Sequence, residues 1–452
     1  MPATPTPLPL WKRFVVLLVP MMASNILQAL SGTLNSVYLG HMVGVDAVAA
    51  ASAVFPISFF FIAFVMGVSS GAMVLIGQAW GAGDGDRAKA VTGATLAATV
   101  VVGIVIAIFG GIFARQLMAM LGTPANVLAE AVAYARVVLI SMPILFLFLV
   151  STVLLRGVGD TVTPLWALCL STLIGLAVTP ALIRGWLGLP PLGAASAAVA
   201  GLVAFIVALA WLAVHLRRRH HPLAPDAVLL RHLRLDGAIL RTVLRIGLPS
   251  GVQMVIIALA EMVLLGLVNQ FGSNATAAYG AVNQVLAYVQ FPAMSVAITV
   301  SILGAQAIGA GRIERLWPIT RTGLLINLVF TGGLIAIAYL LSRTILGFFF
   351  TDPAVIELAQ QLLHIVLWSI IPFGMGGVLA GMMRASGTVL APTAISIITI
   401  IGVEVPVAWI LSDRIGVEGV WIAYPATFVT MLLLQAAYYT FVWRRKAIQR
   451  IV

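Results

Sequence analysis

Two carboxylates lie deep inside long apolar segments of this 452-residue chain, at Glu261 and Glu404. They follow the arginines Arg245 and Arg384 by 16 and 20 residues, or about 24–30 Å along a helix at roughly 1.5 Å per residue. Desolvated carboxylates at similar depth can hold a proton or a hard cation. We therefore predict a coupling site for H⁺ or Na⁺ at Glu261 and Glu404, with no cofactor and no other metal. The alternative is a pair of carboxyl groups hydrogen-bonded to neighbouring helices, without a transport role.

Neutral polar residues within the apolar segments are secondary candidates for contacts with a cation or a substrate. An amide or hydroxyl in such a segment can serve as a ligand, or can simply join two helices by a hydrogen bond. We expect His364 to be a satisfied core histidine, and Arg136 to snorkel or to pair with Glu130. The candidate contact residues are Asn25, Asn35, Gln253, Asn283, Gln284, Tyr288 and His364.

The segments that position these residues have the length and composition of membrane spans. The chain is 62% hydrophobic and 9% charged, whereas a soluble domain carries about 25% charged residues. A spanning helix needs about 20 apolar residues, and uncharged runs of that length recur along the whole sequence. We predict an all-α integral membrane protein with twelve transmembrane helices, six in each half.

The chain repeats itself at an offset of 228 residues. Gln78-Ala79-Trp80-Gly81-Ala82-Gly83 returns as Gln306-Ala307-Ile308-Gly309-Ala310-Gly311, and Leu155–Gly159 returns as Met383–Gly387. A duplicated, very apolar chain is typical of a secondary transporter with two lobes. We predict pseudo-symmetric lobes at residues 1–216 and 246–452, joined by a basic linker at 217–245. The motif residues expected to have a structural role are Gln78, Gly81, Gly83, Arg156, Gly159, Gln306, Gly309, Gly311 and Arg384.

The basic residues are distributed unequally between the two sides of the predicted membrane. Twenty of the 25 Lys and Arg residues fall on the side of the termini and the linker. Cytoplasmic loops carry such an excess, so both termini are expected in the cytoplasm of a bacterial-type plasma (inner) membrane. The net charge of +11 is then explained by contact with anionic headgroups, and no nucleic-acid partner is expected. Nothing in the sequence requires more than a monomer.

Several motifs resemble those of the multidrug and toxic compound extrusion (MATE) transporters. They are the duplicated Gln-Ala-x-Gly-Ala-Gly, the run from Arg156 to Pro164 with its echo at Arg384–Pro392, the Leu187–Pro190 stretch, and Pro20 with Pro249. The resemblance covers about residues 10–445. It implies export of bulky, often cationic or amphiphilic organic compounds by antiport with H⁺ or Na⁺. It also implies that the first and fifth spans of each half pack together, which would bring Glu261 and Glu404 face to face.

The sequence departs from the family pattern at the usual acidic positions. Many members carry an aspartate where this chain has Asn35, and the fifth span lacks the further acid found in others. In the second half, Ile257 and Phe373 occupy positions that are acidic in another branch, while Glu261 lies one helical turn past Ile257. We therefore expect no acidic site in the first half and a rearranged one in the second. Asn283 and Gln284 are favoured contacts because the eighth span faces the seventh in this family.

Two other functions are compatible with part of these observations. A lipid-linked saccharide flippase of the same superfamily would show more spans and several cavity arginines, whereas Arg136 is the only arginine deep within a span here. A membrane-embedded enzyme would need metal-ligand spacing or a nucleophile motif, and neither is present. The chain is therefore expected to be a transporter rather than an enzyme.

Overall fold

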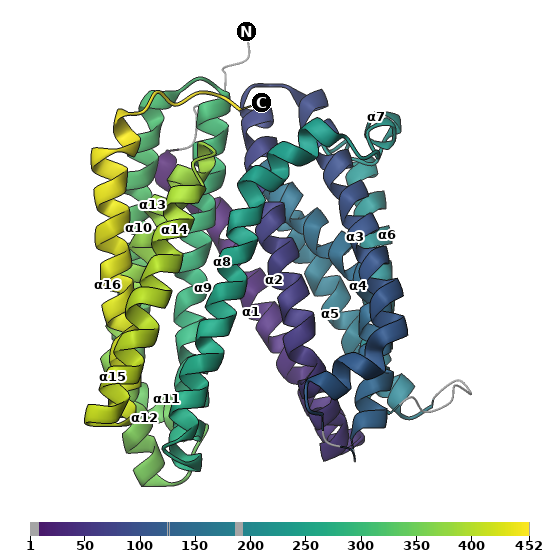
Figure 1. Ribbon diagram of the computed structural model, residues 1–452. Helices are drawn as coiled ribbons and strands as arrows, with labels where there is room; N and C mark the ends of the chain where they lie inside the picture. The colour runs from purple at the N-terminus through teal and green to yellow at the C-terminus, as the bar shows by residue number, and fades with distance from the viewer. Residues whose placement is uncertain (1–8, 124, 126, 186–192, 452) are drawn as a thin grey trace. The chain divides into compact units, whose positions relative to one another are not determined.

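The computed structural model describes residues 9–123, 125, 127–185 and 193–451 (Figure 1). Within these ranges the regular structure is helical, without a strand. Twelve helices are long and apolar enough to cross a membrane, which confirms the predicted number of spans. Such long helices satisfy their own backbone polar groups, as a segment in lipid must. The Leu187–Pro190 motif lies outside the described residues.

Close packing divides the chain into two compact units. The N-terminal unit is Ala23–Gly251, and the C-terminal unit joins the described part of Met1–Met22 with Val252–Val452. These boundaries fall inside the first and seventh spans, α1 (Leu10–Met42) and α8 (Gly237–Asn269). Each of these two helices therefore contributes to both units. The lobes expected at 1–216 and 246–452 place α1 wholly in the first lobe, and the expected linker at 217–245 ends within α8.

In the N-terminal unit, α2 and α3 pack against α4, and α5 packs against α6 (Figure 1). The short helix α7 belongs to the linker and contacts α3. The bounds are α2 Val45–Gly81, α3 Gly85–Met120, α4 Leu128–Gly157, α5 Val162–Ile183, α6 Ala195–Arg218 and α7 Ala227–Arg231.

In the C-terminal unit, α9 packs against α10 and α13, and α16 packs against α13 and α15. The tenth span consists of α12 and α13, and the eleventh consists of α14, a π-helical turn at Ile400–Glu404 and α15. The bounds are α9 Ser273–Gly309, α10 Leu316–Leu340, α11 Ser342–Gly347, α12 Pro353–Val366, α13 Ile370–Ala385, α14 Leu390–Thr399, α15 Val405–Ile415 and α16 Val417–Phe441.

Glycines explain why the start of α8 belongs to the N-terminal unit. A Cβ atom added to Gly71 of α2 would lie 2.6 Å from the carbonyl oxygen of Val243 and 2.7 Å from the nitrogen of Gly247. Real Cβ atoms do not approach other atoms so closely, so only glycine permits this contact between the backbones of α2 and α8. Small residues allow the same close approach between helices in membranes generally.

The internal duplication is visible in the backbone at the helix ends. Gly83 and Gly311 follow α2 and α9 with φ of 76° and 70°, a left-handed conformation that glycine adopts without steric cost. The preceding carbonyls of Gln78 and Gln306 each accept a 3.0 Å bond, from the amides of Ala82 and Ala310. The same arrangement therefore ends the second span of each half.

Candidate functional site

A hydrogen-bond network surrounds Glu261 in the C-terminal unit. The Oε2 atom of Glu261, on α8, accepts a 2.9 Å hydrogen bond from the hydroxyl of Tyr279 on α9. It accepts a second of the same length from the hydroxyl of Tyr424 on α16. The two hydroxyl oxygens lie 3.1 Å apart. Three helices from separate parts of the sequence therefore converge on one carboxylate oxygen.

A buried tryptophan packs against both tyrosines of this network. Trp421 lies three residues before Tyr424 on α16, and its ring centroid is 5.1 Å from that of Tyr279 and 5.7 Å from that of Tyr424. Trp421 is fully buried, and its Nε1 atom has no hydrogen-bond partner among the described residues. Apolar rings exclude water, and charge–charge and hydrogen-bond interactions are stronger where water is excluded.

The second acid, Glu404, lies at the end of the π-helical turn in the eleventh span. Its side chain is 5% exposed, and it interacts electrostatically with Glu261. No side chain in the described part of the chain forms a hydrogen bond with its carboxyl group. The two acids thus share one region but have different surroundings, since Glu261 has two donors and Glu404 has none.

The π-helical turn has a cause in the local sequence. The amide of Val405 bonds to the carbonyl of Ile400, five residues earlier. Pro406 follows directly and has no amide hydrogen, so the regular ladder of α-helical bonds cannot continue through it. Such turns occur frequently at functional sites, and here the turn ends at the buried acid.

Among the secondary candidates, Asn283 interacts with one of the two tyrosines of the network. It follows Tyr279 by one helical turn on α9, and its side chain interacts with the Tyr279 hydroxyl. Gln253 and Gln284 are half-buried, and Tyr288 is exposed and packs edge-on against Phe291. Within the described residues, these three form no hydrogen bond with Glu261 or Glu404.

Sequence analysis did not identify Tyr279 and Tyr424. Each tyrosine lies inside an apolar span, and this position could have indicated a polar partner, because a buried tyrosine hydroxyl usually forms a hydrogen bond. The spacing along the chain could not show that both hydroxyls meet at the same carboxylate, since they lie on helices separated by more than a hundred residues.

The N-terminal unit contains a cavity of about 340 Å³ instead of an acidic pair. Asn35 lines it, and no charged residue is found among its described lining residues. Asn25, on the same helix, is half-buried outside this lining. The polar groups that face the cavity include Gln28, Asn35, Ser58, Tyr134, Ser171 and Thr172.

The expectation that His364 belongs to the core is wrong, and of the two alternatives for Arg136 the structure contradicts the pairing with Glu130. His364 is exposed rather than part of the core, because it lies where α12 meets α10, with its ring edge-on to Tyr339 and Nε2 3.4 Å from the Ser342 hydroxyl. Arg136 is also exposed, and its Nε donates to the carbonyl of Gly111 at 3.2 Å rather than pairing with Glu130. Neither side chain lies in a buried cavity.

The glycine and arginine motifs lie at helix ends. Gln78 is fully buried, Gly81 is the last residue of α2 and Gly309 the last of α9. The amides of Gly159 and Gly387 bond to the carbonyls of Arg156 and Arg384 at 2.9 and 2.8 Å.

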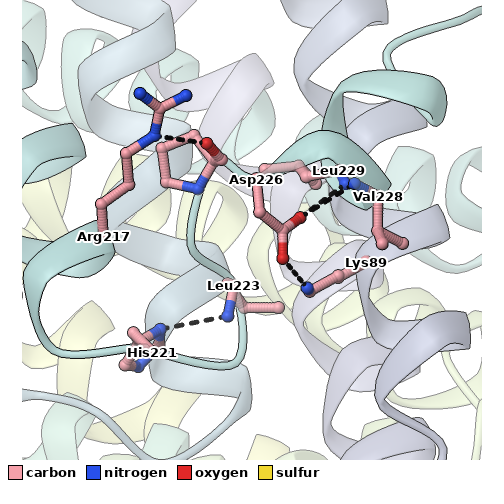
Figure 2. A network of polar contacts seen from close by, with 8 residues as sticks. Lys89, Arg217, His221, Leu223, Asp226, Val228 and Leu229 are labelled. Atoms are coloured by element: carbon pink, nitrogen blue, oxygen red, sulfur yellow. Dashed lines mark hydrogen bonds and ion pairs between the residues drawn. The ribbon is translucent and has the colours of Figure 1, made fainter.

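The linker is attached to the N-terminal unit by polar contacts (Figure 2). Asp226 forms an ion pair with Lys89 of α3 and accepts bonds from the first amides of α7. The hydrogen bond from Lys89 holds the pKa of Asp226 below its ordinary value. Arg217 donates to the carbonyl of Pro225 at 2.6 Å, and His221 lies 3.5 Å from Asp160.

Comparison with known families gives two matches to the same family model. The model described as MatE matches residues 20–181 and again residues 249–410. One match lies in each half of the chain, which agrees with the internal duplication. Together they cover well over half of the sequence.

Several curated proteins and solved structures are similar to this chain in sequence or in fold. The chain is 44% identical over 444 residues to the "Probable multidrug resistance protein YoeA" of Bacillus subtilis, covering 98% of this chain and 96% of that protein. It is 26% identical to the "FAD transporter" of Shewanella oneidensis, covering 92% and 91%. A crystal structure of the Vibrio cholerae MATE transporter VcmN superposes with a TM-score of 0.89 at 20% identity, covering 97% and 98%.

Proposed function

The chain belongs to the MatE family of multidrug efflux transporters, and on that premise we propose that it exports organic compounds by antiport with protons, using Glu261 and Glu404 as the cation site. The observation that supports this proposal is the carboxylate of Glu261, held by Tyr279 and Tyr424 beside a second buried acid. Two neighbouring carboxylates cannot both be ionised in a water-poor site without a large cost. Uptake and release of a positive charge relieves that cost.

The arrangement of donors favours a proton over Na⁺. A hard cation is bound by several oxygen lone pairs, whereas Oε2 of Glu261 already accepts two hydrogen bonds. Coordination of Na⁺ by this atom would require at least one tyrosine to turn away. A proton needs only one free carboxyl oxygen, and Glu404 offers two without a side-chain donor among the described residues. Na⁺ at Glu261 and Glu404 is the alternative that the experiment below distinguishes.

The helix α8 provides a physical link between the cation site and the rest of the transporter. It carries Gly247, packed against α2, and Glu261 further along the same helix. When the hydrogen bonds from α9 and α16 to Glu261 form or break, the contacts that fix the position of α8 change. Rigid helices with two arrangements transmit such changes in alternating access. One charge moving through the membrane potential supplies about 2.3 kcal/mol per 100 mV.

We further propose that the cavity of the N-terminal unit contacts the organic substrate. Its lining combines amide and hydroxyl groups with the phenylalanines Phe55, Phe148 and Phe205. Mostly apolar cavities with a few polar groups are typical of small-molecule sites. Because no described lining residue is charged, recognition here depends on hydrogen bonds and ring stacking. This lining gives no support to a saccharide flippase, which would need cationic groups for a pyrophosphate.

We also propose that both termini lie in the cytoplasm and that the transporter is a monomer. The excess of basic residues on the linker side supports cytoplasmic termini in a bacterial inner membrane. A monomer would suffice, because both compact units and the acidic pair are contained in one chain.

The test is transport of a fluorescent organic cation into proteoliposomes, driven separately by a pH gradient and by a Na⁺ gradient. Glu261→Gln and Glu404→Gln are compared with wild type and with Glu418→Gln. Glu418 is exposed in the first turn of α16, so it controls for the loss of an acid on one of the same helices. We expect the pH gradient to drive wild type and Glu418→Gln but not Glu261→Gln.

Two outcomes would contradict this proposal. Transport driven only by the Na⁺ gradient would show that Na⁺, and not the proton, is the coupling ion. Full coupled transport by the Glu261→Gln and Glu404→Gln variants would exclude both carboxylates. Substrate exchange without a gradient shows whether each variant is folded and binds substrate.

A further inference from the structure

A second cavity, of about 530 Å³, lies where the linker joins the N-terminal unit. Its walls are the start of α5, with Val162 and Trp166, and the end of α6, with Trp211 and His215. The linker closes it with residues 220–222. Nothing in the proposed transport cycle uses this cavity.

The chemistry of the α6 wall changes along the helix. Trp211, His215 and Arg219 follow one another at intervals of four residues, which places them on one face. The rings of Trp211 and His215 stack at 4.7 Å between centroids. Eight residues correspond to about 12 Å of helix, so the cavity has an aromatic part within the span and a basic part at its end.

The α5 wall is equally suited to the boundary of a membrane. Trp166 is 60% exposed and lies one turn after Val162, which is 45% exposed. Tryptophan is enriched where the apolar interior meets the headgroups. The indole rings of Trp166 and Trp211 line the cavity where two spans meet the linker, and such rings are suited to the boundary between headgroup and acyl chain.

The only acid in the cavity lining, among the described residues, already has polar contacts at both carboxylate oxygens. Asp160 accepts bonds of 3.1 and 2.9 Å from the amides of Val162 and Thr163 at the start of α5. Its other oxygen lies 3.5 Å from His221. Arg219, by contrast, has no ion pair among the described residues, so its guanidinium group is available to an anion in the cavity.

An unusual backbone conformation forms the basic end. His220 has φ of 48°, the only positive φ of a non-glycine residue in the described part of the chain. The amides of His220 and His221 bond to the carbonyls of Arg217 and Leu216, as at a helix end closed by glycine. A histidine at this position has a steric cost that glycine would avoid, yet it adds an imidazole beside Arg219.

We propose that this cavity binds the phosphate of an anionic phospholipid from the leaflet on the linker side, with Arg219 and His220 at the phosphate and Trp166 and Trp211 along the glycerol and upper acyl chain. Basic pockets between spans on the cytoplasmic side bind such headgroups. Inorganic phosphate carries a negative charge, as the lipid headgroup does, but it has no apolar group to contact Trp166 and Trp211. This inference does not depend on the coupling ion or on the exported substrate.

The test is binding of phosphatidylglycerol with brominated acyl chains to the full chain in neutral detergent, followed by quenching of tryptophan fluorescence. Wild type is compared with Arg219→Gln and with the matched control Arg218→Gln, an exposed arginine outside the cavity lining. Brominated phosphatidylcholine and inorganic phosphate are the other two arms. The variant His220→Gly keeps the helix end and removes only the imidazole.

We expect phosphatidylglycerol to bind wild type about tenfold more tightly than phosphatidylcholine, the change that one interaction with a charged group commonly provides. Arg219→Gln should lose this preference, His220→Gly should lose part of it, and Arg218→Gln should keep it. Equal binding of the two lipids, or equal losses in the two arginine variants, would overturn the proposal. Displacement of the lipid by inorganic phosphate at millimolar concentration would overturn the assignment to a lipid in favour of a soluble phosphate.

Discussion

The two units of this protein share a duplicated framework but differ in the chemistry that it supports. The second span of each half ends in the same turn, at Gly83 and at Gly311. Yet the C-terminal unit places two acids and two tyrosines together, whereas the N-terminal unit places Asn35 and other uncharged groups around a cavity. Duplication thus preserves the residues that determine backbone geometry, while the polar residues inside the spans are free to diverge. This difference agrees with our proposal that the C-terminal unit binds the coupling cation and the N-terminal unit contacts the organic substrate.

The largest effect should follow from removing the acid that distinguishes the C-terminal unit. We expect Glu261→Gln to reduce gradient-driven transport to the level of empty liposomes, because the glutamine cannot exchange a proton. Transport in proteoliposomes with an imposed pH gradient measures this effect. Gradient-driven transport retained in this variant would show that coupling does not depend on the acid that distinguishes the C-terminal unit.

A smaller effect should follow from removing one donor of the network. Tyr424→Phe deletes one of the two hydrogen bonds to Glu261 and keeps the ring that packs on Trp421. Hydrogen bonds to charged groups contribute about 1.5–3 kcal/mol, so we expect roughly a tenfold or larger loss of rate with coupling preserved. Initial rates under a fixed pH gradient test this, with Tyr438→Phe as the control, because the Tyr438 hydroxyl lies on the same helix but bonds to Lys446 rather than to Glu261. An unchanged rate would remove the network from the mechanism.

The N-terminal unit should respond to pH outside the membrane, at the linker. Burial lowers the pKa of His221, and Asp160 opposes part of this shift. The folded linker thus favours the neutral form of His221. The stability that neutral His221 gives to the folded linker is fully present above the ordinary histidine pKa of about 6.5, and it is lost as the pH falls below that value. His215 also lowers this pKa, whereas Asp226 titrates at lower pH because Lys89 lowers its pKa.

Hydrogen exchange of the amides in α7 at pH 7.5 and 5.5 measures this response. Once each rate is divided by the intrinsic exchange rate at that pH, we expect lower protection of these amides at pH 5.5, corresponding to a loss of up to about 1 kcal/mol, as is usual for partly exposed charged groups. His221→Gln should remove most of the difference. A linker that becomes more protected at pH 5.5 would show that the pairing with Asp160 outweighs burial.

The smallest change is expected from adding an acid to the N-terminal unit. Asn35→Asp places a carboxyl group in a cavity whose described lining has no second acid. We therefore expect the double variant Asn35→Asp with Glu261→Gln to remain uncoupled in the same transport assay. Restored coupling would show that any buried acid suffices and that the tyrosine network is not required.

Much of the architecture could be predicted from the sequence, because the properties that decide it are local. A run of about 20 apolar residues must form a helix in lipid, since its backbone groups have no other partners. The twelve spans and the repeated helix ends follow from this rule and from glycine spacing. The two deep acids were visible for the same reason, as rare charges within apolar segments.

The tertiary structure decided which side chains meet. Tyr279 and Tyr424 converge on Glu261 only because α8, α9 and α16 turn particular faces toward one another. His364 proved exposed, since a position within a span does not specify which face of the helix is covered. Hydropathy thus determined the spans and the two acids within them from the sequence alone, whereas the partners of those acids depended on helix packing, which side-chain shape and close backbone contact determine.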